Sequence, residues 1–446
     1  MEEIRIKQPK GFSEIDGSSL LNRYTQNRAA IHSYVARISE DKYRFWSKAQ
    51  HKEPAEGFTK VESWYLAREV RKISSRSIPV KTPDGTNFTW LRLMYTDELL
   101  REIDMYAGGN FLVQSQTDAE STQKQKYLTR GIMEEAIASS QLEGADTSRK
   151  YAKRMIAENI KPRNSSDQMI LNNFKTLSRI DEEYKDSNLS QELLLDMHTQ
   201  LTKNTFEDGN DDVGRFRNDA DEIVVKYEGK IAHIPPNEEV LKRELDRLID
   251  YANDTTRFVH PVIKAIVLHF WIGYLHPFVD GNGRIARAIF YWYMLKNNYW
   301  AIVYLPISLI IKRAPARYTY SYIFTEQDNL DFTYFYDYNI KQIIKAIHEF
   351  KDYASKVSHE NAEVNEKLKN SYKINDRQKQ LVHYIIADKE NHITITSHQK
   401  LNGVSRQTAH RDISGLEKNG LLLPEKNGRN VRYYASNKLI ALVHTA

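Results

Sequence analysis

The chain has 446 residues, more than a single hydrophobic core normally serves, so we expect two or three domains. Hydrophobic residues make up 41% and charged residues 28% of the chain, a balance that excludes a disordered protein. The formal net charge of +5 is too small for this length to indicate a nucleic-acid binder by itself. Cysteine is absent, which excludes disulfides and thiolate metal sites and fits a reducing compartment.

Nothing in the sequence indicates a membrane protein. We find no apolar run of about 18 residues that could span a bilayer. The first residues, MEEIRIKQPK, also lack the apolar segment of a signal peptide. We therefore expect a cytoplasmic protein that does not bind a membrane.

The N-terminal region, residues 1–119, carries no motif that we can interpret. Helix-like spacing of apolar residues occurs at 18–50 and 60–76. The stretch PVKTPDGTNFTW at 79–90 is punctuated by Pro and Asp-Gly, which predicts a turn or hairpin. We expect a partly helical domain whose role the sequence does not reveal.

The central region, residues 120–355, is predominantly helical in its periodicity, and the expected fold class is mostly α. The expected helices are 124–143, 167–185, 190–204, 237–252, 261–274, 282–296 and 331–356. The exception is EIVVKYEGKIAHIPP at 222–236, in which two short β-rich runs flank Glu228-Gly229 and predict a hairpin. By itself, such a hairpin can be an ordinary surface element.

The first of these helices ends in the sequence SSQLEG. Ser139 and Glu143 are four residues apart and share a helix face, and Gly144 is a natural helix terminator. This pattern is common on solvated helices, so alone it does not indicate a function.

Residues 276–287, HPFVDGNGRIAR, concentrate the chemistry of the chain. His276 has an ordinary pKa of about 6.5 and can accept a hydroxyl proton near neutral pH. Asp280 is a hard oxygen ligand of the kind that binds Mg²⁺ together with substrate phosphates. These two residues predict a general base and a metal ligand.

The rest of the motif suits phosphate. Gly281 and Gly283, on either side of Asn282, allow backbone N–H groups to turn toward an anion at the start of the expected helix 282–296. Arg284 and Arg287 are three apart, so both can hold the same phosphate chain. Gly281, Gly283 and Ala286 also fit a dinucleotide fingerprint. We reject it because Pro277 interrupts the preceding run and no Asp or Glu lies between Asp280 and Glu326 to bind a ribose.

This stretch resembles the signature of the Fic family, HPFx[DE]GNGRxxR, at every fixed position. The resemblance implies a helical Fic core that binds ATP with Mg²⁺ and transfers AMP to a hydroxyl side chain of a protein. It implies His276 as the base and Asp280 as the metal ligand. The implied phosphate contacts are Asp280, Gly281, Asn282, Gly283, Arg284 and Arg287.

Two further stretches resemble elements of the same family. The hairpin at 222–236 is similar to the flap that holds a target segment by strand addition, which implies the target-positioning residues Ile223, Val224, Val225, Ile231 and His233. The SSQLEG stretch resembles the inhibitory motif [ST]xxxE[GN], which implies an inhibitory role for Ser139, Glu143 and Gly144. By that resemblance, Glu143 pairs with Arg287 and keeps the γ-phosphate from its productive position.

The C-terminal segment from 375 onward resembles a winged helix-turn-helix, with three helices followed by a hairpin around Asn427-Gly428. Gly403 lies in the expected turn and Ser405 can cap the recognition helix. The candidate DNA contacts in the first half of that helix are Arg406, Gln407, His410 and Arg411. Winged helices also dock proteins, so both partners stay open. The polar stretch 356–374 is expected to be a linker.

The sequence therefore predicts an autoinhibited protein adenylyltransferase that uses ATP and Mg²⁺. Three alternatives stay open: a nucleotide-sensing transcriptional regulator, transfer of another phosphate-containing group, and removal of AMP through water activated by Glu143. The expected partners are a target protein, which can be the chain itself, DNA through the C-terminal domain, and a second copy in a homodimer.

Overall fold

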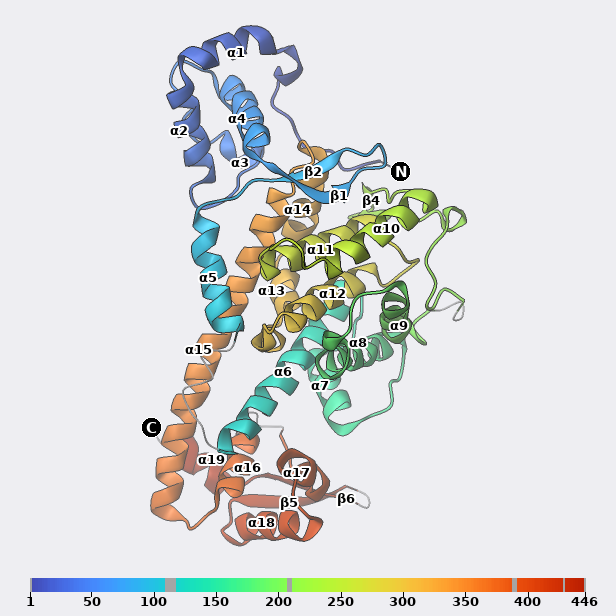
Figure 1. Ribbon diagram of the computed structural model, residues 1–446. Coiled ribbons are helices and arrows are strands. Elements are labelled where there is room, and N and C mark those ends of the chain that lie inside the picture. Colours follow the sequence, from blue (N-terminus) through green and yellow to red (C-terminus); the bar gives the residue numbers. More distant parts are fainter. Residues whose placement is uncertain (1, 109–117, 207–210, 387–390, 428–429, 445–446) are drawn as a thin grey trace. The chain divides into compact units, whose positions relative to one another are not determined.

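The computed structural model describes all residues except 1, 109–117, 207–210, 387–390, 428–429 and 445–446 (Figure 1). Helices predominate, and the described strands form three separate two-stranded antiparallel sheets. The expected mostly α fold class is confirmed. The chain divides into two compact units, one with residues 1–111 and 128–347 and the other with residues 112–127 and 348–446.

The first unit begins with four helices and a hairpin. These are α1 (Gly17–Gln26), α2 (Arg28–Ser39), α3 (Trp46–Ala49), α4 (Lys60–Ser74), β1 (Arg76–Lys81) and β2 (Asn87–Trp90). A capping box between Thr59 and Glu62 fixes the start of α4. The expected hairpin at 79–90 is confirmed, with its turn at Asp84-Gly85. The core of this part includes Trp64 and Phe45, which pack edge to face.

The next helices include a central pair, α11 and α12, and all but the first part of α6 lie in the first unit. They are α5 (Tyr95–Ala107), α6 (Asp118–Leu142), α7 (Arg149–Glu158), α8 (Ser165–Glu182), α9 (Gln191–Thr202), α10 (Glu238–Asn253), α11 (Pro261–Leu275), α12 (Asn282–Lys296), α13 (Ile307–Lys312) and α14 (Pro315–Gln327). Between α9 and α10 lies the expected hairpin of β3 (Val225–Tyr227) and β4 (Lys230–His233). The sequence did not predict α5, α7, α13 or α14 as separate helices.

The central pair, α11 and α12, is buried along almost its whole length. A helix that is apolar all round must be enclosed by other elements. Trp271 and Trp292 are fully buried, and Pro261 at the first turn starts α11 where its missing N–H has no cost. The first half of the 276–287 motif forms the loop between these two helices, and the second half is the start of α12, so the most buried part of the fold presents the motif.

The stretch 356–374, expected to be a linker, is helical through Ser371. It is the end of α15 (Thr333–Ser371), a single helix of 39 residues. Val364 and Leu368 are buried in the core of the second unit, and these two apolar side chains one turn apart give the polar stretch a packed face. The linker prediction was wrong because the overall polarity of the stretch hid this face.

The second unit contains α16 (Asp376–Ile386), α17 (Ile395–Asn402), α18 (Arg406–Lys418), β5 (Leu422–Asn427), β6 (Asn430–Ala435) and α19 (Asn437–His444). Gly403 ends α17 in the left-handed conformation, and the Ser405 side chain caps α18, as expected. Asn427 ends β5, but Gly428 at the expected turn lies outside the described residues. Asp412 of α18 is buried and accepts from Arg377 at 2.8 Å, which ties α18 to α16.

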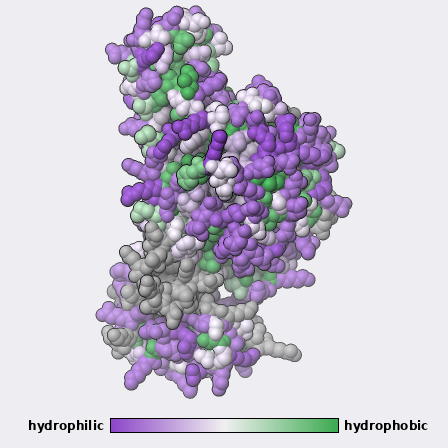
Figure 2. Space-filling view, in the orientation of Figure 1, coloured by the Kyte–Doolittle hydropathy of each residue, from purple (hydrophilic) through white to green (hydrophobic). Residues whose placement is uncertain are grey.

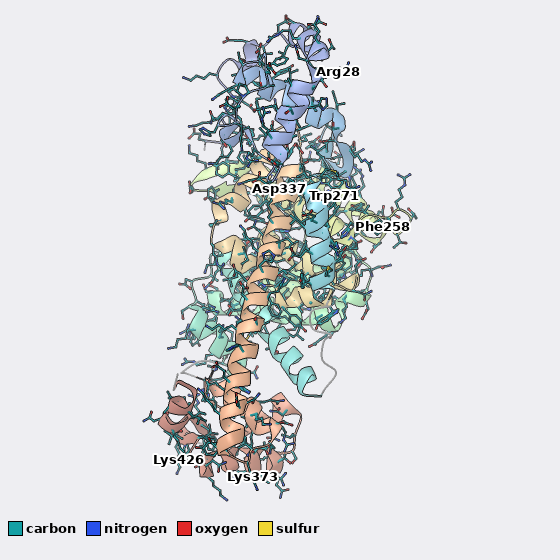
Figure 3. The ribbon with its side chains drawn as sticks, turned by 90° about the vertical axis from the view of Figure 1, so that its left-hand side faces the viewer. Arg28, Phe258, Trp271, Asp337, Lys373 and Lys426 are labelled. Carbon is teal, nitrogen blue, oxygen red and sulfur yellow. The ribbon has the colours of Figure 1, made fainter. Side chains whose placement is uncertain are left out.

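The surface of the described residues is mostly polar. In the view of Figure 2 apolar side chains appear as small separate patches. Phe258, in the loop before α11, is 88% exposed and projects from the surface (Figure 3). Among the helices that the structure describes, none combines the length and apolar composition needed to cross a bilayer.

Candidate active site

The catalytic candidate His276 occupies the turn that ends α11. Its backbone is left-handed, with φ of 49°, which is rare for a residue other than glycine and points to a functional constraint. The Nδ1 atom lies 3.1 Å from the carbonyl oxygen of Gly273, so Nδ1 carries the proton and Nε2 is the basic nitrogen. Burial lowers the pKa of His276 to about 4, which keeps the ring neutral at physiological pH.

The loop after His276 is closed by the Asn282 side chain. Its Oδ1 accepts from the Phe278 N–H at 2.9 Å and its Nδ2 donates to the Phe278 carbonyl at 2.7 Å. Because both ends of the amide serve the loop, a phosphate contact at this residue would use the backbone N–H. Gly281 precedes α12 in the left-handed conformation with φ of 83°, as expected, whereas Gly283 lies within α12 and does not adopt it. The first N–H groups of α12 have no partner within the helix, as at any helix N-terminus, and such a terminus can hold an anion.

The two arginines of the motif are almost fully buried and are held differently. Arg284 donates to the Leu201 carbonyl at 3.0 Å and to the Asp280 carboxylate at 2.9 Å. Arg287 donates from Nε to the Ser139 hydroxyl at 2.8 Å, and from Nη2 to the Ser139 carbonyl at 3.0 Å. Their guanidinium groups thus bring two positive charges to the first turns of α12.

Glu143 lies in the turn directly after α6. Its Oε1 accepts from Arg287 Nη2 at 2.8 Å, so the expected contact between the two residues is present. Gly144 follows with φ of 98° and ends the helix, as predicted. A side chain at Gly283 would place its Cβ 2.1 Å from Glu143 Oε1. The carboxylate therefore rests on the backbone of α12 at its N-terminal turn, where a phosphate would bind.

The part of α6 that carries Ser139 is fixed by buried contacts of the same helix. Glu135 accepts from the Ser308 N–H at 2.9 Å and from the Ser308 hydroxyl, and burial raises the pKa of its carboxyl group. Asn173 of α8 donates to the Ala136 carbonyl at 3.3 Å. These contacts hold Ser139 and Glu143 against α12.

Asp280 has the features of a Mg²⁺ ligand. Its side chain is half exposed, and only Oδ2 is engaged with Arg284. Within the described part of the chain, no three His, Asp or Glu side chains come together as a metal cage. This fits Mg²⁺, which commonly binds through one or two carboxylates together with substrate phosphates.

His198 is a site residue that the sequence analysis missed. Its ring stacks on Phe278 with centroids 3.8 Å apart, and its Nδ1 accepts from the Gly214 N–H at 3.1 Å. The proton therefore sits on Nε2, which donates to the Asp280 carbonyl at 2.9 Å. Burial lowers the pKa of His198 to about 4, in agreement with a neutral ring. The signal in the sequence is the spacing of His198 from Leu194 and Leu201, which places this histidine on the apolar face of the expected helix 190–204.

The hairpin is attached to the same loop through Arg217 and His233. Arg217 donates to the carbonyls of His276 at 2.7 Å and Pro236 at 2.5 Å. His233 of β4 lies between the Glu326 carboxylate at 2.6 Å and the Tyr274 carbonyl at 2.7 Å. Burial opposes its charge, but Glu326 and the Tyr274 carbonyl hold the pKa of His233 above its ordinary value.

Four of the expected target-positioning residues lie in or just before the paired strands, and the fifth, His233, anchors the hairpin to the protein. Val225 and Ile231 lie in the paired strands, and Ile223 and Val224 precede β3. His233 was expected to face a target, but its side chain points into the protein and anchors β4. Sequence alternation could not show this because the partner Glu326 is 93 residues away.

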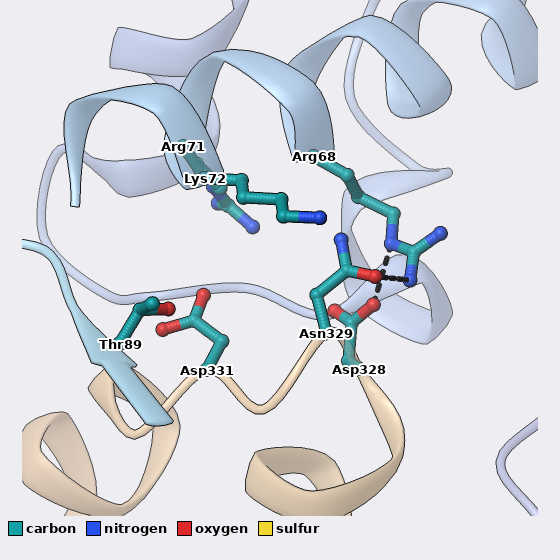
Figure 4. A pocket seen from close by; sticks show the side chains of 7 residues that line it. All are labelled: Arg68, Arg71, Lys72, Thr89, Asp328, Asn329 and Asp331. Carbon is teal, nitrogen blue, oxygen red and sulfur yellow. Dashed lines mark hydrogen bonds and ion pairs between the residues drawn. The ribbon is translucent and has the colours of Figure 1, made fainter. Parts of the chain in front are cut away.

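A small polar cavity in the first unit lies among residues outside this motif. Arg68, Arg71, Lys72, Thr89, Asp328, Asn329 and Asp331 line it (Figure 4). Arg68 donates to Asp328 at 2.5 Å and to Asn329 at 2.9 Å. With room for about one water molecule, the cavity is a polar joint between α4 and the α14–α15 turn.

Comparison with known proteins identifies the domain that carries the motif. Residues 188–294 match the model of the Fic/DOC family, so the chain contains a Fic domain. The protein adenylyltransferase fic-1 of Caenorhabditis elegans is 28% identical over 115 residues, which are 26% of this chain and 20% of that protein. The protein adenylyltransferase Fic of Nematostella vectensis is 36% identical over 58 residues, 13% of this chain and 14% of that protein.

The chain thus spans about a fifth or less of the length of the curated relatives it matches. A solved structure of a fragment of Fic-1 from C. elegans superposes with a TM-score of 0.50 at 15% sequence identity. The alignment covers 80% of this chain and 90% of that fragment. This likeness concerns the fold, which is the helical Fic fold.

We predict that His198→Ala destabilises the protein and weakens nucleotide binding. The change removes the ring under Phe278 and leaves the Asp280 carbonyl and Gly214 N–H without their partner, at a cost of about 2–4 kcal/mol. Thermal denaturation and ATP titration would measure both effects. His198→Gln keeps a donor and an acceptor but not the stacked ring, so we expect an intermediate loss. Unchanged ATP affinity in His198→Ala would contradict the positioning role.

Proposed function

We propose that this protein is a nucleotidyltransferase that moves AMP from ATP to a hydroxyl side chain of a protein. The observation that carries the proposal is the pairing of a neutral, half-buried His276 with the unpaired N–H groups at the start of α12. The base and the phosphate site belong to one closed loop, which meets the need to hold both reactants in a fixed geometry. The adenylyltransferases among the relatives support this choice of group.

In the proposed reaction, His276 Nε2 accepts the proton of the target hydroxyl as its oxygen attacks the α-phosphorus of ATP. A new oxygen–phosphorus bond forms, the bond to the bridging oxygen breaks, and pyrophosphate leaves. The N–H groups of α12 and the guanidiniums of Arg284 and Arg287 stabilise the negative charge. Asp280 would hold Mg²⁺, which supplies further positive charge to the phosphates.

We propose further that Glu143 inhibits this reaction. Its carboxylate is bonded to Arg287 and rests on Gly283, so it occupies the same anion site that the γ-phosphate needs. The two anions repel each other and compete for one guanidinium. ATP then binds in an unproductive pose. A role of Glu143 in activating water for AMP removal is the alternative use of the same carboxylate.

The second unit favours DNA as a further partner. Ser405 caps α18, and Arg406, Gln407, His410 and Arg411 are all exposed on its first turns. Side chains at these positions of a recognition helix can reach base edges in the major groove. A DNA-bound, nucleotide-sensing regulator is therefore the second candidate function, and protein docking is the outcome if DNA fails to bind.

His276→Ala is expected to lower AMP transfer by a factor of about 10² to 10⁴ with nearly unchanged ATP affinity, because the base is lost and the phosphate contacts remain. Transfer from labelled ATP and ATP titration would measure the two quantities. Because the pKa of His276 is lowered to about 4, the wild-type base stays neutral down to about pH 5 and is protonated below pH 4. Unchanged transfer by the variant would refute the assignment.

Glu143→Gly should raise AMP transfer, including onto tyrosines or threonines of the protein itself. Arg287→Ala should not activate, because it removes both the partner of Glu143 and a phosphate ligand. The double variant should resemble Arg287→Ala alone, as expected of residues that act as one unit. Glu143→Gln is the matched control, because it keeps the shape of the Glu143 side chain and removes its negative charge. Equal rates in the wild type and Glu143→Gly, with labelled ATP and Mg²⁺, would exclude the inhibitory role.

If the second unit binds DNA, Arg406→Ala and Arg411→Ala should weaken binding to pooled duplex fragments. The affinity of the wild type should fall steeply with salt through counterion release. Arg411→Lys keeps the charge but loses the bidentate geometry, so it should preserve nonspecific binding better than Arg411→Ala. Fluorescence anisotropy at several salt concentrations would measure this. No retention of duplex at low salt would favour protein docking.

A further inference from the structure

The outer edge of β4 is occupied by residues 2–4 of the same chain. The Ile231 N–H donates to the Glu2 carbonyl at 3.0 Å, and the Ile4 N–H donates to the Ile231 carbonyl at 2.8 Å. Glu3 and Ile231 form a parallel bridge, and Figure 1 shows the N-terminal end beside β4. Since the other edge of β4 pairs with β3, residues 2–4 add a third strand to the hairpin.

Side chains from two elements hold this added strand. Lys230 Nζ lies 2.7 Å from the Glu2 carboxylate. Gln327, at the end of α14, accepts from the Ile6 N–H at 2.9 Å and donates to the Ile4 carbonyl at 2.7 Å. The side chains of Glu2 and Lys230 are 75% and 50% exposed, so their ion pair contributes little. Glu2, Glu3 and Arg5 are exposed and Ile4 is half-buried, so residues 2–5 can leave the edge while Ile6 stays packed against the N-terminal core.

The occupied edge belongs to the candidate active site. His233, in the same strand as Ile231, bonds to the Tyr274 carbonyl two residues before His276. Arg217 joins the loop of His276 to the segment after β4. An unpaired strand edge accepts any extended polypeptide through backbone bonds. A target segment that pairs with this edge would therefore be held on the same rigid frame as the base.

The composition of the added strand suits an occupant that cannot react. Residues 2–12 read EEIRIKQPKGF and contain no serine, threonine or tyrosine. The strand therefore makes the backbone contacts of an extended peptide but offers no hydroxyl group to the base. It would block the edge without being consumed.

We propose that residues 2–6 are an intramolecular competitor for the extended target segment at the outer edge of β4. This inference rests on the proposed function. Residues 2–6 would inhibit binding of the target, whereas Glu143 would inhibit productive binding of the nucleotide. A segment of the same chain acts at an effective concentration in the millimolar range, so a free target competes poorly until the segment leaves. The apparent affinity for the target is the intrinsic affinity multiplied by the fraction of time that the edge is open.

The first experiment measures occupancy of the edge without any need for catalysis. Hydrogen exchange of the Ile231 amide is compared in the wild type, a chain lacking residues 2–5, Ile4→Pro and Gln327→Ala. Ile4→Pro removes the N–H that bonds to Ile231, and Gln327→Ala removes both side-chain contacts. Arg5→Ala is the matched control, because the exposed Arg5 side chain is paired with Glu3 of the same segment, at 3.7 Å, and not with β4 among the described residues.

We expect exchange of the Ile231 amide to accelerate by about ten-fold or more in the shortened chain, with smaller effects in the two point variants. Arg5→Ala should behave as the wild type. The synthetic peptide EEIRIKQ, added at millimolar concentration, should restore protection in the shortened chain. Equal exchange in the shortened chain and the wild type would overturn the proposal.

The second experiment measures competition in the Glu143→Gly background, with labelled ATP and a pooled cell extract as acceptor. Removal of residues 2–5 should lower the half-saturating extract concentration about ten-fold and leave the ATP dependence unchanged. The peptide EEIRIKQ should inhibit competitively with the extract. Changed exchange with unchanged labelling would overturn the competitor role alone. No labelling by any variant would overturn the proposed function and with it the competitor role, while exchange still reports whether the edge is occupied.

Discussion

The site depends on the balance of positive charge at the start of α12. Arg284 and Arg287 are almost fully buried there, beside the unpaired N–H groups of the helix. Buried charge is costly without a partner, so carboxylates must lie close by. Asp280 is the carboxylate partner of Arg284, and Glu143 is the carboxylate partner of Arg287. A phosphate entering this place would have to displace or avoid Glu143, and the proposed inhibition rests on this contact.

The geometry of the loop follows from a second set of contacts made mainly through backbone atoms. The Asn282 side chain closes the loop on Phe278, the His198 ring stacks on Phe278, and Arg217 donates to the carbonyl of His276. These side chains are buried and fully committed to neighbours. The Nε2 atom of His276 can therefore be held in one tautomer and one direction, which the proposed general-base chemistry requires.

In the proposed function, the hairpin links the base His276 to the binding of the target segment. His233 is buried against Glu326 and the Tyr274 carbonyl, an arrangement that favours the charged ring and ties β4 to the end of α11. The outer edge of β4 contacts residues 2–4 through backbone hydrogen bonds and one exposed ion pair, between Lys230 and Glu2. The His233 side chain thus anchors β4, while the segment that occupies its outer edge can be exchanged. A strand with these two properties suits a binding edge whose occupant changes.

The sequence by itself determined the 276–287 motif, the mostly helical fold, the hairpin at 222–236 and the caps at Gly144, Gly403 and Ser405, because each depends on residues close together in the chain. It missed the helix through 356–371, where Val364 and Leu368 are too sparse to mark a face within a polar stretch. Only the tertiary structure decided the support by His198, the inward direction of His233 and the strand added by residues 2–4. These contacts join residues about 80 to 230 positions apart, and packing of the helices, which local periodicity does not encode, brings them together.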